Sequence, residues 1–277
     1  MSTSGEIEWK LLSDLIETRF GMTFVGVRRE ILESRLRPRL KELHLETFLE
    51  YYHYLRSHPG REAELAELAR RITNNETYFY REPHHFDILV QHILPQLSAE
   101  LKHRPIRILS AGCSSGEEPY SMVIALQNAG LELRGYRWEI DACDLNPVRL
   151  AQAREAVYEA TSLRVCNEDV RQRYFLQANG RFLLKERHRT GVRFLEANLA
   201  TTDPRPEWGP YDAILCRNLL IYFSEPAFYA LVARFARVLR LGGYLMLGHS
   251  ESLIDKVREF EPVCLSGAVV YRRVTAA

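Results

Sequence analysis

A turn rich in glycine and serine offers the clearest chemistry in this sequence. The segment IRILSAGCSSGEEPYSM, residues 106–122, has the pattern of a short apolar strand, a turn and the start of a helix. Gly112 and Gly116 lack a Cβ atom, so a ligand can press against the backbone there. Glu117 and Glu118 place acid where a bound pyrophosphate would need amide donors and a positive helix end. The pattern therefore favours a cationic ligand without phosphates, and S-adenosylmethionine, a sulfonium, fits it.

Three further predicted strands end in residues that suit such a ligand. After the second strand comes Asp144, whose carboxylate can accept hydrogen bonds from both hydroxyls of a ribose. After the third come Asn198 and Leu199, which suit the edge and the face of an adenine. After the fourth, YDAILC, come Arg217, Asn218 and Tyr222. Because ligands of doubly wound sheets bind at the carboxyl ends of the strands, we expect one shared site at this edge.

The segment TNNETYFYREPHHF, residues 73–86, sets Asn75, Thr77 and Arg81 among aromatic side chains. We expect this segment to close over the cofactor. The alternative interpretation is a linker between domains that ends in a capped helix start. Asp144 and Asn198 taken alone also have structural alternatives, a helix cap and a loop turn. Asn146-Pro147 predicts a helix cap followed by proline at the first helical position.

A basic stretch near the N-terminus, RREILESRLRPRLKEL, gives a clue to a partner. On one helix the 100° step places Arg28, Arg35 and Arg39 within about 20° of a common direction. Six basic and two acidic residues lie between Arg28 and Lys41. A solvated helix face is the plain alternative, whereas the density of charge favours docking to an acidic protein surface. Pro38 is expected to kink or break this helix.

Composition limits the class of protein. With 277 residues, 46% of them hydrophobic and 26% charged, the chain resembles a soluble globular protein of one large or two modest domains. A net charge of +1 gives no general field to recruit nucleic acid. Five widely spaced cysteines predict reduced, mostly buried thiols and no metal site. The chain shows neither a signal peptide nor an apolar run suited to a membrane, so we expect a cytoplasmic protein without membrane insertion.

The order of predicted elements changes near residue 75. Residues 1–75 contain helical segments separated by glycine, proline and capping residues, which predicts an all-α N-terminal domain. Residues 76–277 alternate strands and helices, which predicts an α/β domain with a mostly parallel sheet. Two strand-like runs around Ser266-Gly267 predict a terminal antiparallel hairpin.

The alternation stops between residues 163 and 194. The basic sequence RYFLQANGRFLLKERHRTGVRF carries turn signals at Asn179-Gly180 and Thr190-Gly191. We interpret residues 163–194 as a small β subdomain inserted in the α/β domain.

Six segments of this chain resemble, in order, the CheR-type chemoreceptor glutamate methyltransferases: TNNETYFYREPHHF, SAGCSSGEEPYS, CDLNPVRLAQAREAVY, EANLA, CRNLLIYF and LGGYLMLGHSES. The resemblance covers nearly the whole chain. It implies the class I S-adenosylmethionine-dependent methyltransferase fold, a Rossmann-like sheet with a terminal antiparallel hairpin and a β insertion. It also implies S-adenosylmethionine as cofactor, S-adenosylhomocysteine as product and no metal. The product on the protein substrate is a γ-glutamyl methyl ester on the cytoplasmic helical bundle of a methyl-accepting chemotaxis receptor.

The resemblance also implies roles for single residues. Arg81 and Tyr222 should lie beside the transferring methyl group, and the basic helix with Arg28, Arg35 and Arg39 should dock to the receptor. With Gly112 of the turn, the implied cofactor contacts are Asn75, Thr77, Arg81, Glu117, Asp144, Asn198, Leu199, Arg217 and Asn218. Family habit predicts a monomer, cytoplasmic and recruited to receptor arrays.

Two departures from the family pattern carry expectations. Tyr80 stands where phenylalanine is usual and should add a polar tip near the site. The first loop of the insertion, within FLQANGRF, is short, whereas relatives that grip a receptor pentapeptide tend to have a longer loop. We therefore expect no pentapeptide tether.

The implied reaction needs positioning more than acid–base chemistry. A glutamate carboxylate is already anionic near neutral pH, so it can attack the sulfonium methyl without a general base. We expect Arg81 and Tyr222 to orient it by hydrogen bonds. Two alternatives stay open: a methyltransferase acting on nucleic acid or an amine, and a non-catalytic sensor of the cofactor. The first lacks the Asp/Asn-Pro-Pro-aromatic motif that base methylation would need after YDAILC.

Overall fold

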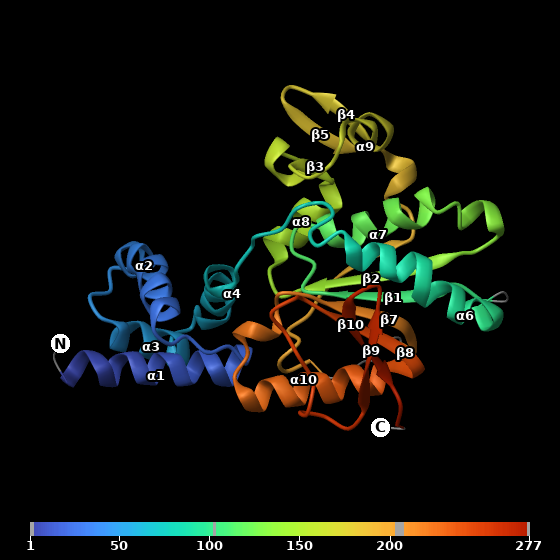
Figure 1. The fold of residues 1–277 in the computed structure, drawn as a ribbon. Helices are drawn as coiled ribbons and strands as arrows, with labels where there is room; N and C mark the ends of the chain where they lie inside the picture. Colours follow the sequence, from blue (N-terminus) through green and yellow to red (C-terminus); the bar gives the residue numbers. More distant parts are fainter. Residues whose placement is uncertain (1–2, 102–103, 203–207, 276–277) are drawn as a thin grey trace. The chain divides into compact units, whose positions relative to one another are not determined.

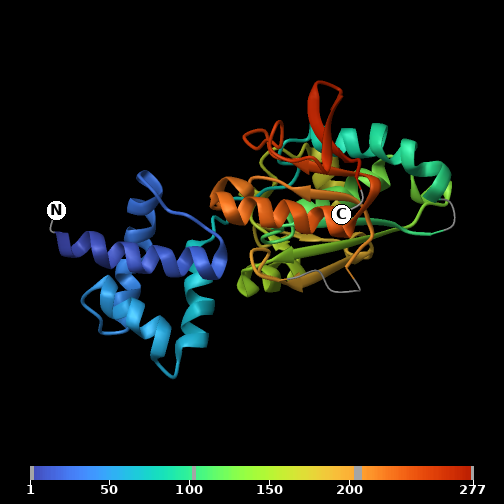
Figure 2. The same cartoon turned by 90° about the horizontal axis from the view of Figure 1, so that it is seen from below.

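The computed structural model describes residues 3–101, 104–202 and 208–275, and these form two compact units. The helical unit comprises Met1–Asn74, Asn198–Thr202 and Tyr222–Leu231. The sheet unit comprises Asn75–Ala197, Asp203–Ile221 and Val232–Ala277. Figures 1 and 2 show the chain from two directions. Among the described residues, no helix combines the length and apolarity needed to cross a bilayer.

The helical unit begins with α1 (Thr3–Phe20), α2 (Val27–Glu42), α3 (Phe48–Ser57) and α4 (Arg61–Ile72). Their buried side chains recur at spacings of three and four residues, as on the apolar face of a helix: Leu12 and Ile16 on α1, Leu32 and Leu36 on α2, Tyr51 and Leu55 on α3, Leu65 and Leu68 on α4. These faces pack together and exclude water, which stabilises helices too short to persist alone.

α2 continues through Pro38, so the expectation of a broken helix was wrong. Proline cannot donate to the carbonyl four residues earlier, which here belongs to Ser34. Both residues are exposed, so water can reach the carbonyl that the helix leaves unpaired. The basic face of α2 is therefore continuous along its length.

Arg39 belongs to an ion-pair network inside the helical unit. Its Nε donates to Oε1 of Glu64 at 3.0 Å and its Nη2 to Oε2 at 2.5 Å, while Nη1 donates to Glu42 at 2.8 Å. The Glu64 side chain is only 2% exposed, and the Tyr51 hydroxyl also donates to it at 2.7 Å. The bond to Glu64 raises the pKa of Arg39 above its ordinary value. Arg39 thus serves the packing of α2 on α4, whereas Arg28 and Arg35 are exposed.

The sheet unit is built on a sheet with strand order β6-β2-β1-β7-β8-β10-β9. The strands are β1 (Ile106–Ala111), β2 (Trp138–Asp144), β6 (Val192–Glu196), β7 (Tyr211–Cys216), β8 (Leu239–Leu247), β9 (Phe260–Leu265) and β10 (Ala268–Arg273). Neighbours from β6 to β8 pair in parallel, whereas β10 pairs antiparallel with β8 and with β9. The Rossmann-like sheet and its terminal hairpin are confirmed. Strand order reverses between β1 and β7, which places a ligand-binding edge after these two strands.

Helices cover both faces of this sheet. α5 (His84–Ile88), the π-helical turn η1 (Leu89–Ile93) and α6 (Leu94–Leu101) precede β1, and α7 (Glu117–Asn128) and α8 (Pro147–Glu155) follow β1 and β2. Figure 1 shows α7 above the sheet and α10 (Glu225–Val238), from Val232 onward, below it. Asn146 caps α8 as predicted, its side chain accepting from the amides of Val148 and Arg149 at 3.1 and 3.3 Å. The cysteines are free thiols, and all but Cys264 are buried.

A separate small sheet lies beyond α7 and α8 in Figure 1. Its order is β3-β5-β4, with β3 (Val157–Tyr158), β4 (Phe175–Ala178) and β5 (Arg181–Leu184), and α9 (Glu168–Tyr174) precedes β4. Asn179 and Gly180, at φ 52° and 76°, make the predicted two-residue turn between β4 and β5.

The expected limits of this insertion, 163–194, differ from the structure at both ends. The small sheet begins earlier, at Val157, and residues from Val192 onward form β6 of the large sheet. Gly191, at φ 81°, turns the chain back towards β2, and its carbonyl accepts from the Ile140 amide at 2.7 Å. The second turn signal therefore marks the return to the large sheet and not another hairpin.

Replacement of Arg39 by alanine should lower the free energy of unfolding by about 3 kcal/mol, because it leaves the buried Glu64 carboxylate without its cation. Arg37→Ala, on the same helix but with a side chain 66% exposed, should change it by less than about 0.5 kcal/mol. Urea unfolding of the two variants checks this. Equal stability of the two variants would show that Arg39 does not hold the helical unit together.

Candidate functional site

The glycines of the turn after β1 bring two helices together. Gly112 and Gly116 adopt φ angles of 83° and 91°, a region that non-glycine residues rarely occupy. The Gly112 amide donates to the carbonyl of Cys143 at 2.8 Å, which links the turn to β2. A Cβ on Gly116 would lie 2.9 Å from the Cβ of Ala153, so this glycine allows α7 to approach α8. The turn is fixed by packing as much as by any ligand.

Asp144, at the end of β2, is tied to the same turn. Its carboxylate accepts from the amide of Ser114 and from that of Asn146, both at 2.8 Å. Burial raises the pKa of Asp144, although these amides and the charge of Arg149 oppose the rise. The Ser114 hydroxyl beside it is buried and has no hydrogen-bond partner among the residues that the structure describes. Asp144 therefore combines a structural role with a second lone pair on each oxygen, and Ser114 offers a polar group that a ligand can use.

Asn75 and Thr77 are half-buried in the segment that precedes α5. The side-chain oxygen Oδ1 of Asn75 lies 3.5 Å from Nδ2 of Asn146, the cap of α8. The structure thus brings Asn75 to the end of β2, beside the turn that holds Asp144.

Glu117 begins α7 and is almost completely buried. Its Oε2 accepts from the Ser115 hydroxyl at 2.8 Å and its Oε1 from the Ser162 hydroxyl at 3.1 Å. Burial raises the pKa of Glu117 despite these bonds. A cation bound nearby would favour the ionised form, as the sequence pattern suggested.

Arg217, at the end of β7, is buried in a polar cluster, with its side chain 2% exposed. Nη1 contacts Glu118 at 3.1 Å and Nη2 contacts Glu82 at 3.3 Å, and Nη2 also donates to the carbonyl of Arg81. The guanidinium carbon lies 5.4 Å from the centre of the Phe86 ring. Arg217 therefore contacts the Arg81 segment directly, through the Arg81 carbonyl and the Glu82 side chain.

Arg81 is half-buried, and its guanidinium contacts residues just before it in the chain. Nη1 donates to the Glu76 carbonyl at 2.8 Å, and the guanidinium lies over the Tyr78 ring at 6.0 Å. Asn218, which the sequence grouped with Arg217, contacts Glu82 through its side chain at 3.4 Å. Arg81, Arg217 and Asn218 are thus brought together around Glu82.

The remaining candidates, Asn198, Leu199 and Tyr222, belong to the helical unit. The Asn198 side chain donates to the carbonyl of Arg19 at 2.7 Å and accepts from the amide of Ala200 at 3.0 Å, and Leu199 is half-buried. The Tyr222 hydroxyl accepts from the side-chain amide of Asn74 at 2.7 Å, and the Arg28 guanidinium lies 5.2 Å from the centre of its ring. Because its oxygen accepts, the Tyr222 hydroxyl keeps its proton for another partner.

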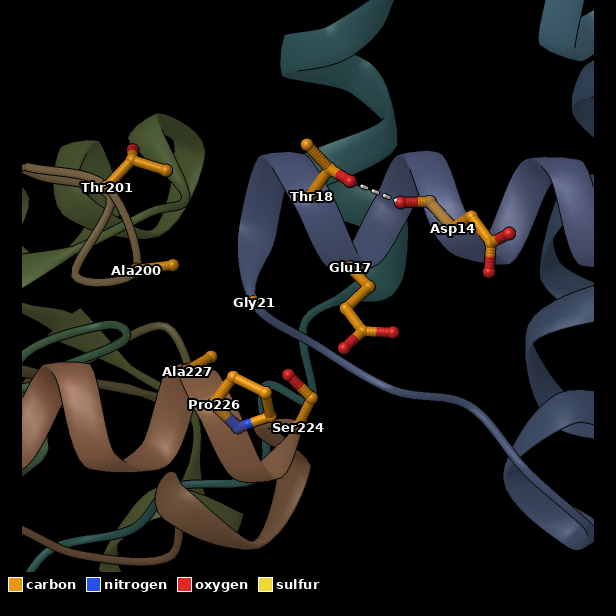
Figure 3. A pocket seen from close by; sticks show the side chains of 9 residues that line it. All are labelled: Asp14, Glu17, Thr18, Gly21, Ala200, Thr201, Ser224, Pro226 and Ala227. Carbon is orange, nitrogen blue, oxygen red and sulfur yellow. Dashed lines mark hydrogen bonds between the residues drawn. The ribbon is translucent and has the colours of Figure 1, made fainter.

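A pocket of about 460 Å³ lies in the helical unit next to these segments, as Figure 3 shows. It is lined by Asp14, Glu17, Thr18, Gly21, Ala200, Thr201, Ser224, Pro226 and Ala227. Gly21 allows these segments to pack closely, since a Cβ there would lie 2.9 Å from the Cβ atoms of Ala200 and Ala227. The sequence did not predict this pocket, because its walls come from three distant segments.

Glu251 organises the chain after β7 and was missed by sequence reasoning. Its carboxylate accepts from the amides of Asn218, Leu219 and Gly248 at 2.7–2.8 Å. It therefore fixes the loop that carries Asn218. The rule applied to the other strands could have found it, because Glu251 follows the end of β8, the last parallel strand.

Tyr80 does not add a polar tip near the site, so that expectation was wrong. Its ring packs edge-on against Phe86, with ring centres 5.4 Å apart, and burial raises the pKa of its hydroxyl. A hydrogen bond from Asn128, at the far end of α7, opposes this rise. The hydroxyl therefore bonds at the far end of α7, away from the strand ends.

The groups gathered at the strand ends suit a nucleoside with a cationic centre. Carboxylates at the ends of β1 and β2 can accept from hydroxyl and ammonium groups, and the unpartnered Ser114 hydroxyl adds a donor. Arg217 follows β7 directly, but its guanidinium is paired with two carboxylates, so it does not offer its charge to a phosphate group. Within the described ranges, His, Cys, Asp and Glu side chains form no group suited to a metal ion.

Comparison with known proteins identifies the family. Residues 75–268 match the family described as CheR methyltransferase, SAM binding domain, and residues 7–73 match the CheR methyltransferase all-alpha domain. The chain belongs to the CheR methyltransferase family. It is an S-adenosylmethionine-dependent methyltransferase of the class I fold.

Relatives match along almost the full chain. The chemotaxis protein methyltransferase of Salmonella typhimurium is 34% identical over 270 residues, 96% of this chain and 90% of the relative. The chemotaxis protein methyltransferase 2 of Vibrio cholerae is 36% identical over 244 residues, 87% of this chain and 83% of the relative. A probable biofilm formation methyltransferase of Pseudomonas aeruginosa is 34% identical over 263 residues, which are 95% of this chain but 61% of that relative.

Gly116→Ala should destabilise the protein by about 1–3 kcal/mol more than Gly135→Ala. Both glycines have left-handed backbones, at φ 91° and 81°, so both substitutions carry similar backbone strain. Only the Cβ at position 116 meets a neighbour, since nothing lies within 4 Å of one at Gly135. Unfolding by urea without cofactor measures the difference. Equal losses of stability would mean that the contact between α7 and α8 is not tight.

Proposed function

We propose that this protein transfers the methyl group of S-adenosylmethionine to glutamate side chains of chemoreceptor cytoplasmic helices and forms γ-glutamyl methyl esters. Arg28, at the start of the basic helix, lies over the ring of Tyr222, and this observation carries the proposal. A surface that attracts acidic protein and a hydroxyl that can hold a carboxylate thus occur together in the helical unit. The names of the relatives agree with this substrate class.

The cofactor site of this proposal consists of residues from the strand ends and the segment before α5: Asn75, Thr77, Gly112, Glu117, Asp144, Asn198, Leu199, Arg217 and Asn218. Asp144 would receive the ribose hydroxyls on the lone pairs that the Ser114 and Asn146 amides leave open. The carboxylate of Glu117 would attract the positively charged end of the cofactor. Arg217 would act through its neighbours, because its guanidinium is already surrounded by protein groups. When bound, the cofactor supplies the electrophilic methyl group.

Arg81 and Tyr222 serve the substrate carboxylate in this mechanism. Arg81 donates N–H groups to it, and Tyr222 donates the proton that its bond with Asn74 leaves free. The carboxylate loses its negative charge as the methyl group transfers. Binding that is strong only in the ground state would therefore not accelerate the reaction, so these residues act by orientation and by excluding water.

The exposed face of α2 is the proposed docking surface. The 100° step places Val27, Ile31 and Pro38 within about 40° of one another, and all three are exposed. Basic residues flank this apolar ridge on both sides, with Arg28 and Arg35 on one side and Arg37 and Lys41 on the other. Such a surface fits a helix with an apolar stripe between acidic residues. Arg39 was also expected to dock, but this proposal assigns that role to Arg37 and Lys41 instead.

We further propose that the protein acts as a monomer in the cytoplasm and is recruited to receptor arrays through this face. The short turn at Asn179-Gly180 agrees with recruitment without a pentapeptide tether. No general attraction to nucleic acid is proposed, because the net charge is only +1.

Incubation with methyl-labelled S-adenosylmethionine and receptor-bearing membranes should yield label that alkali releases as methanol. Arg81→Ala should lower this transfer by roughly tenfold or more at saturating cofactor, because the carboxylate loses its orienting donor. Label stable to alkali would indicate an N-methyltransferase, and absence of label would indicate a cofactor sensor. Unchanged turnover in the variant would remove Arg81 from the mechanism.

Arg35→Glu should reduce receptor methylation about tenfold at low salt and leave cofactor affinity unchanged, since the charge reversal repels an acidic helix. Arg61→Glu supplies the matched control, because Arg61 is an exposed arginine on α4 of the same unit. The measurements are initial methylation rates and calorimetric cofactor binding. Similar rates for the two variants would exclude the α2 face as the docking surface.

A further inference from the structure

Arg81 lies between two residues with left-handed backbones. Tyr80 has φ 57° and Glu82 has φ 53°, although neither is glycine. Such a conformation costs about 1–2 kcal/mol for each residue. It persists only where surrounding groups determine it, and such strain clusters at functional sites. The contacts that hold this turn therefore decide where the Arg81 guanidinium points.

The backbone of the turn is held on both sides of Arg81. The Tyr80 amide donates to the Ser121 hydroxyl on α7 at 2.9 Å, and the carbonyl of Arg81 accepts from Arg217. Glu82 supplies the remaining anchors through its side chain, which is 14% exposed.

Each carboxylate oxygen of Glu82 has two neighbours. Oε2 lies 3.3 Å from Nη2 of Arg217 and 3.2 Å from Nδ1 of His85. Oε1 lies 2.8 Å from Nδ1 of His249 and 3.4 Å from Nδ2 of Asn218. One side chain thus joins the Arg81 turn to the loops that follow β7 and β8.

Glu82 is also one of the two carboxylates that pair with the buried Arg217. Burial opposes ionisation of Glu82, yet its contacts with the two histidines and the charge of Arg217 hold its pKa well below its ordinary value. Burial raises the pKa of Glu118, the other carboxylate beside Arg217. Glu82 therefore supplies part of the negative charge beside Arg217, together with Glu118 at 3.1 Å.

We propose that Glu82 is a positioning residue for methyl transfer. Its carboxylate holds the left-handed turn and the Arg217 guanidinium in place, and this geometry aims Arg81 at the substrate carboxylate. Glu82 itself touches neither substrate nor cofactor. The inference rests on the proposed function, since it assumes that Arg81 orients the group that accepts the methyl.

A double-mutant cycle with Arg81 tests this role. Glu82→Gln keeps the shape of the side chain but places an N–H₂ group where two cationic or N–H donors need an acceptor. At saturating cofactor it should lower alkali-labile methyl transfer to receptor-bearing membranes about tenfold when Arg81 is present. In the Arg81→Ala background the same substitution should change the rate by less than about twofold, because nothing remains to be positioned.

A merely structural role gives a different result. If Glu82 only stabilises the fold, Glu82→Gln lowers the rate by the same factor in both backgrounds, and the proposal fails. Glu82→Asp keeps the charge and should restore part of the activity in the Arg81 protein alone. Should Glu82→Gln not fold, the cycle with Glu82→Asp decides by the same criterion.

The cycle also separates this inference from the proposed function. An Arg81→Ala protein with full activity contradicts the proposed role of Arg81. Loss of activity on Arg81→Ala together with equal factors for Glu82→Gln contradicts only the positioning role of Glu82. Glu261→Gln, which removes a charge from an exposed pair with Arg272, should leave the rate unchanged in both backgrounds.

Discussion

The guanidinium of Arg217 is a positive charge placed where water scarcely reaches. Burying an unpaired charge costs several kcal/mol, so such a group persists only with good partners. Here those partners are Glu118 in the first turn of α7, Glu82 beside Arg81, and the Arg81 carbonyl. The end of β7, the start of α7 and the segment before α5 must therefore take up one arrangement together. The left-handed backbone around Arg81 depends on that arrangement.

At the strand ends of the sheet unit, buried carboxylates likewise hold loops in place. Asp144 holds the Ser114 turn, and Glu251 holds the loop after β7, each through backbone amides. Carboxylates used in this way make loops rigid without regular secondary structure. A methyl transfer that depends on orientation needs such rigid loops, because small displacements of the reacting groups weaken it.

The sequence predicted best what is decided locally. The cap at Asn146, the turn at Asn179-Gly180 and the terminal hairpin depend on neighbouring residues, and the structure contains all three. The strand-end rule also placed Asp144 and Arg217 at the ends of two strands, and in the structure they stand at the ends of β2 and β7.

Partners distant in the chain could not be predicted from one sequence. A helical wheel gave the direction of Arg39, but its partner Glu64 lies on another helix. Arg217 and its partner Glu82 are likewise far apart in the sequence. So are Tyr80 and Asn128, whose side chain bonds to the Tyr80 hydroxyl. The C-terminal limit of residues 163–194 was misplaced because Gly191 resembles a hairpin signal while it returns the chain to the large sheet.

The apolar ridge of α2, with basic residues on both sides, has a kinetic consequence. Long-range attraction between charges speeds encounter, and salt screens it over about 10 Å at 0.1 M. Apolar contact through Val27 and Ile31 is not screened in this way and governs how long a complex lasts. Ionic strength should therefore act mainly on the rate of arrival at a receptor and much less on the residence time. If the proposed docking surface is correct, an acidic receptor helix is captured quickly without being held for long.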